Sequence, residues 1–166
     1  MKKFWILLIV AIFLTACGGQ ETMETVSDIY DIQAMSQLRR LDLQLPEDAV
    51  VESMENDNAG VIYFCDGYTL TVQMAESGDL DRTLRQTTGF GRDQLTVMQT
   101  LQEDVKRYDC VWSAVGEGGD QIGRAAVLDD GGYHYVVTVM ADASVAGELT
   151  PIWQDILGSA KLVNID

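Results

Sequence analysis

Two segments with strand character and a tight turn between them constrain the fold of this chain most strongly. Residues 61–65 are apolar on both faces of a strand, whereas residues 68–74 alternate between apolar and polar side chains. The Asp66-Gly67 pair between them is a strong signal for a two-residue hairpin turn. The sequence therefore predicts an antiparallel hairpin whose second strand has one buried face and one face in water.

Further strands are expected on both sides of this hairpin, joined by short turns rich in glycine, aspartate and asparagine. They are predicted at residues 41–45, 49–54, 94–101, 105–115, 121–128 and 133–140. Within 105–115 one face is expected to carry aromatic and small residues, because alternate residues of a strand point to the same side. These are Tyr108, Cys110, Trp112 and Ala114. We expect about six of these segments to form one antiparallel sheet.

Helical patterns are expected near both ends of the chain. Residues 28–40 carry apolar side chains near helical spacing. The last helix is expected to start at Thr150, which can act as its N-cap, with Pro151 in the first helical position. Residues 79–90 are a less clear connector that suits one helical turn. A sheet with helices packed on it belongs to the α+β class.

The N-terminus has the layout of an export signal. Lys2 and Lys3 are followed by the unbroken apolar run of residues 4–13 and then by small residues. A positive start, an apolar core and small residues at the cut are typical of a signal peptide. The apolar run is too short for an ordinary transmembrane helix, which needs about 20 residues.

Leu14, Thr15, Ala16 and Cys17 end this segment, and they resemble the bacterial lipobox. The resemblance implies that a signal peptidase recognises the first three residues and cleaves before Cys17. It also implies a diacylglyceryl thioether on Cys17, which would hold the protein on the extracytoplasmic face of the cell membrane. Two or more acyl chains make such an anchor durable. The alternative is an ordinary secretory signal that happens to contain a cysteine.

The predicted domain organisation follows from this cleavage site. Residues 1–16 form the signal peptide, residues 17–27 a lipidated flexible tether, and residues 28–166 a single α+β domain. The tether begins with two glycines and has little apolar content, which favours a flexible chain. The domain is of ordinary size and long enough to bury a hydrophobic core.

The chain is strongly acidic, with 26 Asp and Glu against 11 Lys and Arg and a formal net charge of −15. Loss of Lys2 and Lys3 with the signal peptide would make the exported chain more acidic still. Such a surface repels nucleic acid and anionic lipid headgroups, so no nucleic-acid partner is expected. The charge favours solubility, and alternatively it offers a docking surface to a protein partner with a basic surface.

Cys65 and Cys110 remain in the exported chain and are candidates for a disulfide. Export places them in a compartment where disulfides persist. A bridge between them would close a long loop and contribute about 4 kcal/mol. The alternative is two buried free thiols, which behave as small hydrophobic side chains.

The order of the later segments resembles that of a known fold family. The segment Leu45-Pro46-Glu47-Asp48-Ala49 leads into the strands, Tyr133-His134-Tyr135 lies in a late strand, and Trp153-Gln154-Asp155-Ile156-Leu157-Gly158-Ser159 closes the pattern. This order resembles the small PsbP-like α/β/α sandwich domains of uncharacterised lipoproteins from gut Firmicutes. The likeness covers roughly residues 41–163 and rests on packing motifs. It implies a fold and a binding or accessory role, and it carries over no catalytic residue.

His134 is the one histidine of the chain, and its strand neighbours Tyr133 and Tyr135 are expected on the opposite face. A histidine can act as a general base near neutral pH. No nucleophile is evident beside it, and the serines of the exported chain fall in no nucleophile-elbow pattern. A structural or surface role is therefore favoured, and no catalytic residue is predicted.

Other polar segments are explained by ordinary structural roles. The acidic glycine loops at residues 117–120 and 129–132 lack the spaced ligands of a calcium loop and suit turns instead, so no metal site or cofactor is predicted. Arg82, Arg85 and Arg92 either bind an anionic ligand or, as we favour, balance the acidic surface.

The sequence is compatible with three functions. The first is a membrane-anchored binding or accessory module without catalysis, which the lipobox, the tether and the acidic surface favour. The second is an extracytoplasmic enzyme such as a cell-wall hydrolase, which would require His134 in a concave site beside acidic residues. The third is a structural envelope protein that works by assembly.

Overall fold

The computed structural model describes residues 39–53, 60–116 and 118–165, and those from Arg39 onward form one compact unit. The expected signal peptide, lipobox and tether lie outside the described residues, as does the expected helix up to residue 38. Arg39 and Arg40 were expected to end that helix, but they belong to a strand, β1. No helix in the described ranges is long and apolar enough to cross a membrane.

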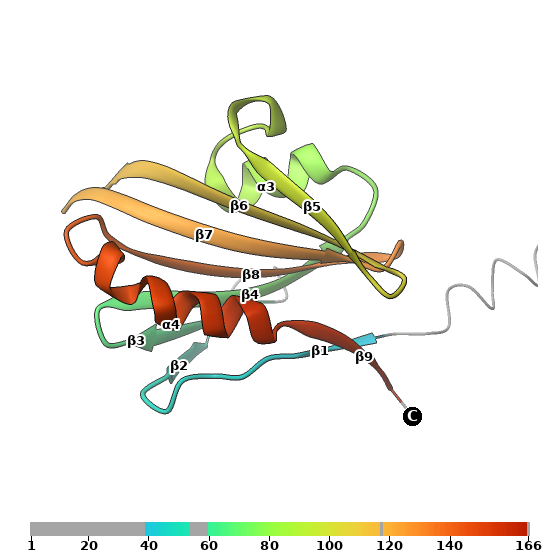
Figure 1. Ribbon diagram of the computed structural model, residues 1–166, viewed down its shortest axis with the longest axis horizontal. Coiled ribbons are helices and arrows are strands. Elements are labelled where there is room, and N and C mark those ends of the chain that lie inside the picture. Colours follow the sequence, from blue (N-terminus) through green and yellow to red (C-terminus); the bar gives the residue numbers. More distant parts are fainter. Residues whose placement is uncertain (1–38, 54–59, 117, 166) are drawn as a thin grey trace, which may run out of the picture. The chain divides into compact units, whose positions relative to one another are not determined.

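Nine strands, two α-helices and one 3₁₀ helix are described (Figure 1). In chain order they are β1 (Arg39–Asp42), β2 (Val50–Ser53), β3 (Gly60–Cys65), β4 (Tyr68–Glu76), α3 (Leu80–Thr88), η1 (Arg92–Gln94), β5 (Val97–Gln102), β6 (Val105–Gly116), β7 (Gly119–Asp129), β8 (Tyr133–Asp142), α4 (Ala146–Ser159) and β9 (Lys161–Asn164).

Seven of the strands form one antiparallel sheet in the order β2-β3-β4-β8-β7-β6-β5, and β1 pairs with β9. The expected sheet is therefore confirmed, with seven strands in place of about six. The β3–β4 hairpin turns at Asp66-Gly67, where Gly67 has a φ of 80°. Glycine suits this turn because a left-handed backbone conformation costs it no steric strain.

Each face of the sheet buries its own apolar core. On one face Trp153 of α4, with no exposed surface, packs with Leu70 and Val139. On the other face Leu84 of α3, equally buried, packs with Tyr108 and Trp112. Figure 1 shows the two helices on opposite sides of the sheet. A unit with two covered faces and its own cores is expected to fold without the preceding residues.

Helix α3 is longer than the single turn expected from the sequence. Asp79 caps its first turn, accepting a hydrogen bond from the Arg82 N–H at 3.2 Å, and Gly89 ends it with a φ of 83°. Thr88 does not break the helix, because its hydroxyl donates to the Leu84 carbonyl at 2.8 Å.

Helix α4 begins at Ala146, four residues before the expected cap. Thr150 is not the cap, since its hydroxyl donates to the Ala146 carbonyl inside the helix at 3.0 Å. Pro151 lies in the second turn, where its missing N–H removes one bond to the carbonyl of Gly147. The expected start was wrong because Ala146 and Leu149 pack against the core, which makes residues 146–149 helical without a side-chain cap.

The candidate disulfide between Cys65 and Cys110 is not formed, and both thiols are free. Three strands lie between β3 and β6 in the sheet, which separates them by roughly 19 Å at ~4.8 Å per strand. A disulfide requires Cα atoms within about 7 Å. The two thiols also belong to clusters on opposite faces, Cys65 with α4 and Cys110 with α3.

Candidate functional site

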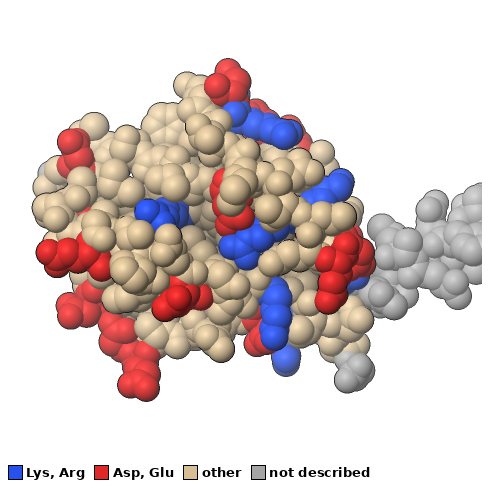
Figure 2. Space-filling model, in the orientation of Figure 1, with Lys and Arg blue, Asp and Glu red and all other residues tan. Residues whose placement is uncertain are grey.

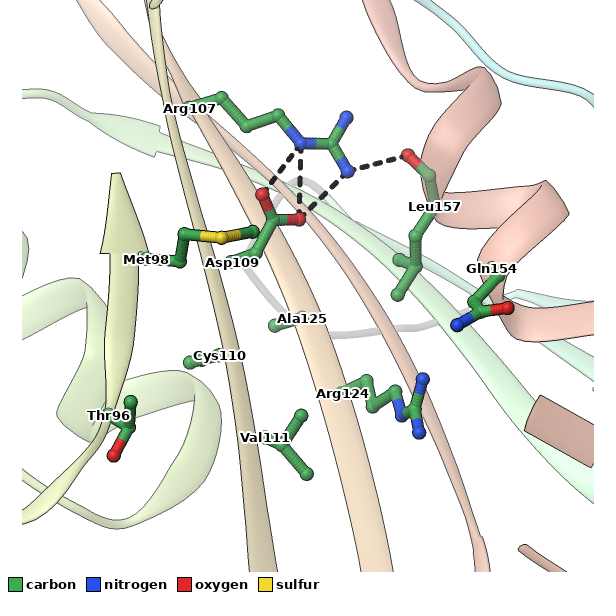
Figure 3. Close-up of a pocket in the computed structure, with 10 residues that line it drawn as sticks. All are labelled: Thr96, Met98, Arg107, Asp109, Cys110, Val111, Arg124, Ala125, Gln154 and Leu157. Atoms are coloured by element: carbon green, nitrogen blue, oxygen red, sulfur yellow. Dashed lines mark hydrogen bonds and ion pairs between the residues drawn. The ribbon is translucent and has the colours of Figure 1, made fainter. Parts of the chain in front are cut away.

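A groove of about 520 Å³ lies on the face of the sheet that carries α4. It exists because α4 packs on β7 and β8 and leaves β6 and the edge strand β5 uncovered beside it. The groove is lined by Thr96, Met98, Arg107, Asp109, Cys110, Val111, Arg124, Ala125, Gln154 and Leu157 (Figure 3). Its volume is in the range of small-molecule sites, which span about 300–1,000 Å³.

Arg107 anchors one end of the groove and is almost completely buried, with 8% of its surface exposed. Its Nε donates to Asp109 Oδ2 at 2.9 Å and its Nη2 donates to Oδ1 at 2.8 Å, which makes a two-point ion pair. The same guanidinium donates to the carbonyls of Leu157 at 2.9 Å and Ala160 at 3.4 Å. Arg107 is therefore neutralised by Asp109 and by the electronegative C-terminus of α4.

Arg124 of β7 lies further along the groove in a different setting. Its guanidinium carbon is 5.9 Å from the centre of the Trp153 ring, a cation–π distance. Nη2 donates to the Thr150 hydroxyl at 3.3 Å. The described residues provide no acceptor for its buried Nε and no carboxylate within ion-pair distance. Arg124 thus carries a positive charge that no described side chain neutralises.

Apolar side chains complete the groove. Met98 of β5 is 60% exposed and Val111 of β6 is 52% exposed. Figure 3 shows the Met98 side chain extending from β5 toward Asp109, and Gln154 extending from α4 on the side of Arg124. Exposed apolar surface that adjoins a few polar groups is the usual composition of a ligand site.

The charge on this face is distributed unevenly. In Figure 2 most acidic side chains lie toward the border of the face, whereas basic side chains lie across its middle. Of the charged residues that line the groove on this face, two are basic, Arg107 and Arg124, and one is acidic, Asp109. The face therefore offers a local site for an anionic group on an otherwise acidic protein.

His134 lies on the opposite face of the sheet, and only 2% of its surface is exposed. Its Nδ1 is 2.7 Å from the Thr83 hydroxyl of α3, and its Nε2 is 3.5 Å from the Ser77 hydroxyl and 3.8 Å from Asp129 Oδ2. Burial lowers the pKa of His134, and Asp129, Asp130 and Asp79 oppose that shift. This network joins β8 to α3 and lines neither of the two cavities described in this section.

The remaining residues singled out from the sequence have structural contacts. Asp129 and Asp130 accept hydrogen bonds from the N–H groups of Gly131, Gly132 and Tyr133, which makes their loop a turn held by its own side chains. Arg85 pairs with Asp81 at 2.7 Å and lies 3.9 Å from Asp93, so this arginine balances neighbouring acidic side chains. Burial raises the pKa of the Cys110 thiol to about 11, which keeps it protonated at neutral pH.

A second cavity of about 540 Å³ lies where β1, β9 and the end of α4 meet, and Gln44, Asp155, Gly158 and Ser159 are among its lining residues. The Nζ of Lys161, the lysine that lines this cavity, is 3.3 Å from Asp42 Oδ2, so Lys161 is already in an ion pair. This cavity lacks the exposed apolar side chains of the groove. We therefore take the groove beside α4 as the candidate site.

The groove residues were not expected from the sequence. One signal was available, since Arg107 and Asp109 are two positions apart in a predicted strand and hence on one face. The proximity of Arg124 and Gln154 depends on how α4 lies on the sheet, which no local pattern encodes. The lipobox residues lie outside the described part of the chain.

No protein-family model matches the chain, and comparison with curated protein sequences gives no match either. Solved structures do resemble it. Cyanobacterial PsbP (CyanoP) from Synechocystis matches with a TM-score of 0.58 and 12% identity over 89% of this chain and 98% of that chain. The chain has a PsbP-like α+β fold.

Two further structures share this fold. LpqN, involved in cell envelope biogenesis of Mycobacterium tuberculosis, has a TM-score of 0.52 and 11% identity, over 77% of this chain and 86% of that chain. A Bacteroides thetaiotaomicron protein has a TM-score of 0.50 and 8% identity, over 74% of this chain and 45% of that chain. At such low identities the likeness shows the PsbP-like fold alone.

Proposed function

We propose that this protein is a membrane-anchored, extracytoplasmic binding module without catalytic activity, and that the groove beside α4 is its binding site. The observation that carries the proposal is the combination in one cavity of exposed apolar side chains, Met98 and Val111, with the guanidinium of Arg124. This is the usual composition of a site that binds a small ligand.

The export signal and the lipobox-like residues support the extracytoplasmic, anchored part of the proposal. The PsbP-like fold is consistent with it, because one structure with that fold belongs to a protein of envelope biogenesis. The burial of His134 supports the non-catalytic part, since a general base must reach its substrate within hydrogen-bond distance.

The test is to ask whether the groove carries a molecule when the full-length protein is purified from its own membrane. Organic extracts of the wild type are compared by mass spectrometry with those of Val111→Trp, whose indole would fill the groove. Val115→Trp is the matched control, because Val115 is on the same strand and face, is 87% exposed and does not line the groove.

We expect a copurifying molecule with the wild type and with Val115→Trp, and its loss from Val111→Trp. Equal recovery from all three proteins, or from none of them, would contradict a binding role for the groove.

Assembly into an envelope structure is the second candidate function, and the edge of the sheet favours it. β5 is the last strand in the sheet order, and its Met98 and Leu101 are 60% and 67% exposed. Exposed edge strands with apolar side chains pair readily with other chains. Light scattering over a range of concentrations distinguishes the two functions, since growth in mass with concentration would support assembly and a constant mass would argue against it.

A further inference from the structure

The two arginines of the groove differ in how their charge is balanced. Arg107 donates to both oxygens of Asp109 and to two carbonyls at the end of α4. Arg124 has one hydrogen bond, to the neutral hydroxyl of Thr150, among the described residues. In this Arg124 differs from Arg39, Arg85 and Arg107, each of which pairs with an aspartate.

Packing holds the Arg124 side chain in place, but it does not give all of the N–H donors an acceptor among the described residues. The guanidinium lies over Trp153, which is fully buried, and the buried Nε has no acceptor among the described residues. An arginine fixed in this way has lost most of its conformational freedom before any ligand arrives. Its planar N–H fork then suits two-point hydrogen bonding to a carboxylate.

Apolar surface lies directly beside this charge. Val111 faces Arg124 across the β6–β7 pair, and Met98 of β5 lies one strand further out. Both side chains are more than half exposed. A ligand bound to Arg124 would therefore cover them if it had an apolar part of suitable length, gaining about 25 cal/mol for each Å² removed from water.

From these contacts we propose that the groove binds a small carboxylic acid with an apolar tail, with the carboxylate on Arg124 and the tail over Val111 and Met98. The Arg107–Asp109 pair is internally neutral, so the groove has one net positive charge, which a monoanion balances. A dianion such as a phosphate monoester would leave excess negative charge near Asp109. The inference rests on the proposed function and adds the chemical class of the ligand.

The test uses the exported chain without residues 1–16 and with Cys17→Ser, so that neither lipid nor detergent competes for the groove. Decanoate and decanol are titrated by calorimetry as probes with the same tail and different head groups. Hydrogen bonds to charged groups contribute about 1.5–3 kcal/mol, so decanoate should bind roughly tenfold to a hundredfold more tightly than decanol.

Three variants test whether the preference for decanoate over decanol arises at Arg124. Arg124→Gln should abolish it and leave decanol affinity unchanged, whereas Arg82→Gln, an exposed arginine on α3 at the opposite face, removes the same charge and should keep it. Met98→Gln should weaken both probes. If Arg124→Gln fails to fold by circular dichroism, Arg124→Lys retains the charge but loses the fork, and should reduce the preference.

Equal binding of decanoate and decanol, or no binding of either, would overturn the proposal. So would a preference that survives both substitutions of Arg124. The copurification experiment tests the binding role separately from the carboxylic-acid proposal. A neutral molecule recovered from the wild type and lost from Val111→Trp would retain the binding role and refute the carboxylic acid.

Discussion

At the scale of single residues, one glycine in the sheet shows how the core limits the sequence. Gly123 of β7 lies directly opposite Trp112 of β6, and the indole ring occupies the space where a Cβ would be. Trp112 is 7% exposed and belongs to the core beneath α3. Because both strands are held by neighbours on either side, the indole cannot move away without disturbing that core.

Gly123→Ala should therefore lower the free energy of unfolding by about 1–3 kcal/mol, the usual range for overpacking a core. The measurement is urea unfolding followed by circular dichroism. Gly158→Ala is the control with the opposite sign, since nothing lies within 4 Å of its added Cβ and alanine favours a helix by about 0.5–1 kcal/mol. An unchanged stability of Gly123→Ala would show that Trp112 can move.

The lowered pKa of His134 makes the stability of the fold depend on pH. Burial lowers its pKa below the ordinary value of 6.5, so the unfolded chain binds a proton more readily than the folded one. The stability that neutral His134 supports is fully present above about pH 6.5. It is lost as the pH falls from there toward the lowered pKa of the folded state.

We expect the free energy of unfolding to fall on acidification below about pH 6.5, and less steeply in His134→Gln. Urea unfolding at several pH values, together with titration of the His134 ring by nuclear magnetic resonance, checks both statements. A pKa at or above 6.5 in the folded protein would contradict the account.

At the scale of elements, the strands followed from the sequence better than the helices did. Alternation and the Asp66-Gly67 turn located the strands because each pattern is local, and the hairpin forms as expected. The extent of α4 did not follow, because residues 146–149 become helical where Leu149 and Ala146 pack against the sheet. The groove was missed for the same reason, since it forms only where α4 leaves β6 uncovered.

Arg107 fixes the C-terminal end of α4 to β6, and its removal tests how much this link contributes. Arg107→Met should lower the free energy of unfolding by about 3–5 kcal/mol, the range for breaking a buried ion pair, because Asp109 and two helix carbonyls lose their donor. Asp109 is partly exposed, which places the expected value toward the lower end.

Unfolding in urea gives the value for Arg107→Met. Arg107→Lys keeps the charge and should lose less stability, since one ammonium cannot reach all the acceptors at once. Equal stability of Arg107→Met and the wild type would mean that packing alone holds α4 on the sheet.

At the scale of the whole molecule, the acidic charge and the proposed anchor belong together. The whole chain has a net charge of −15, and the exported chain would be more acidic still without Lys2 and Lys3. This charge would keep the protein away from anionic headgroups, so lipid on Cys17 would be its means of staying at the membrane. Cys17→Ala should move the protein to the soluble fraction or leave it as an unprocessed precursor. Fractionation with immunoblotting checks this, and unchanged lipidation and maturation would refute the anchor.

The central claim is that ligands bind on the face beside α4 and not on the face of α3. Hydrogen–deuterium exchange of the exported chain, with and without an organic extract of the host envelope, tests it most directly because the ligand need not be known. We predict slower amide exchange in Val97–Gln102 and in α4, Ala146–Ser159, and no change in Leu80–Thr88. Protection confined to Leu80–Thr88, or no protection anywhere, would contradict the claim.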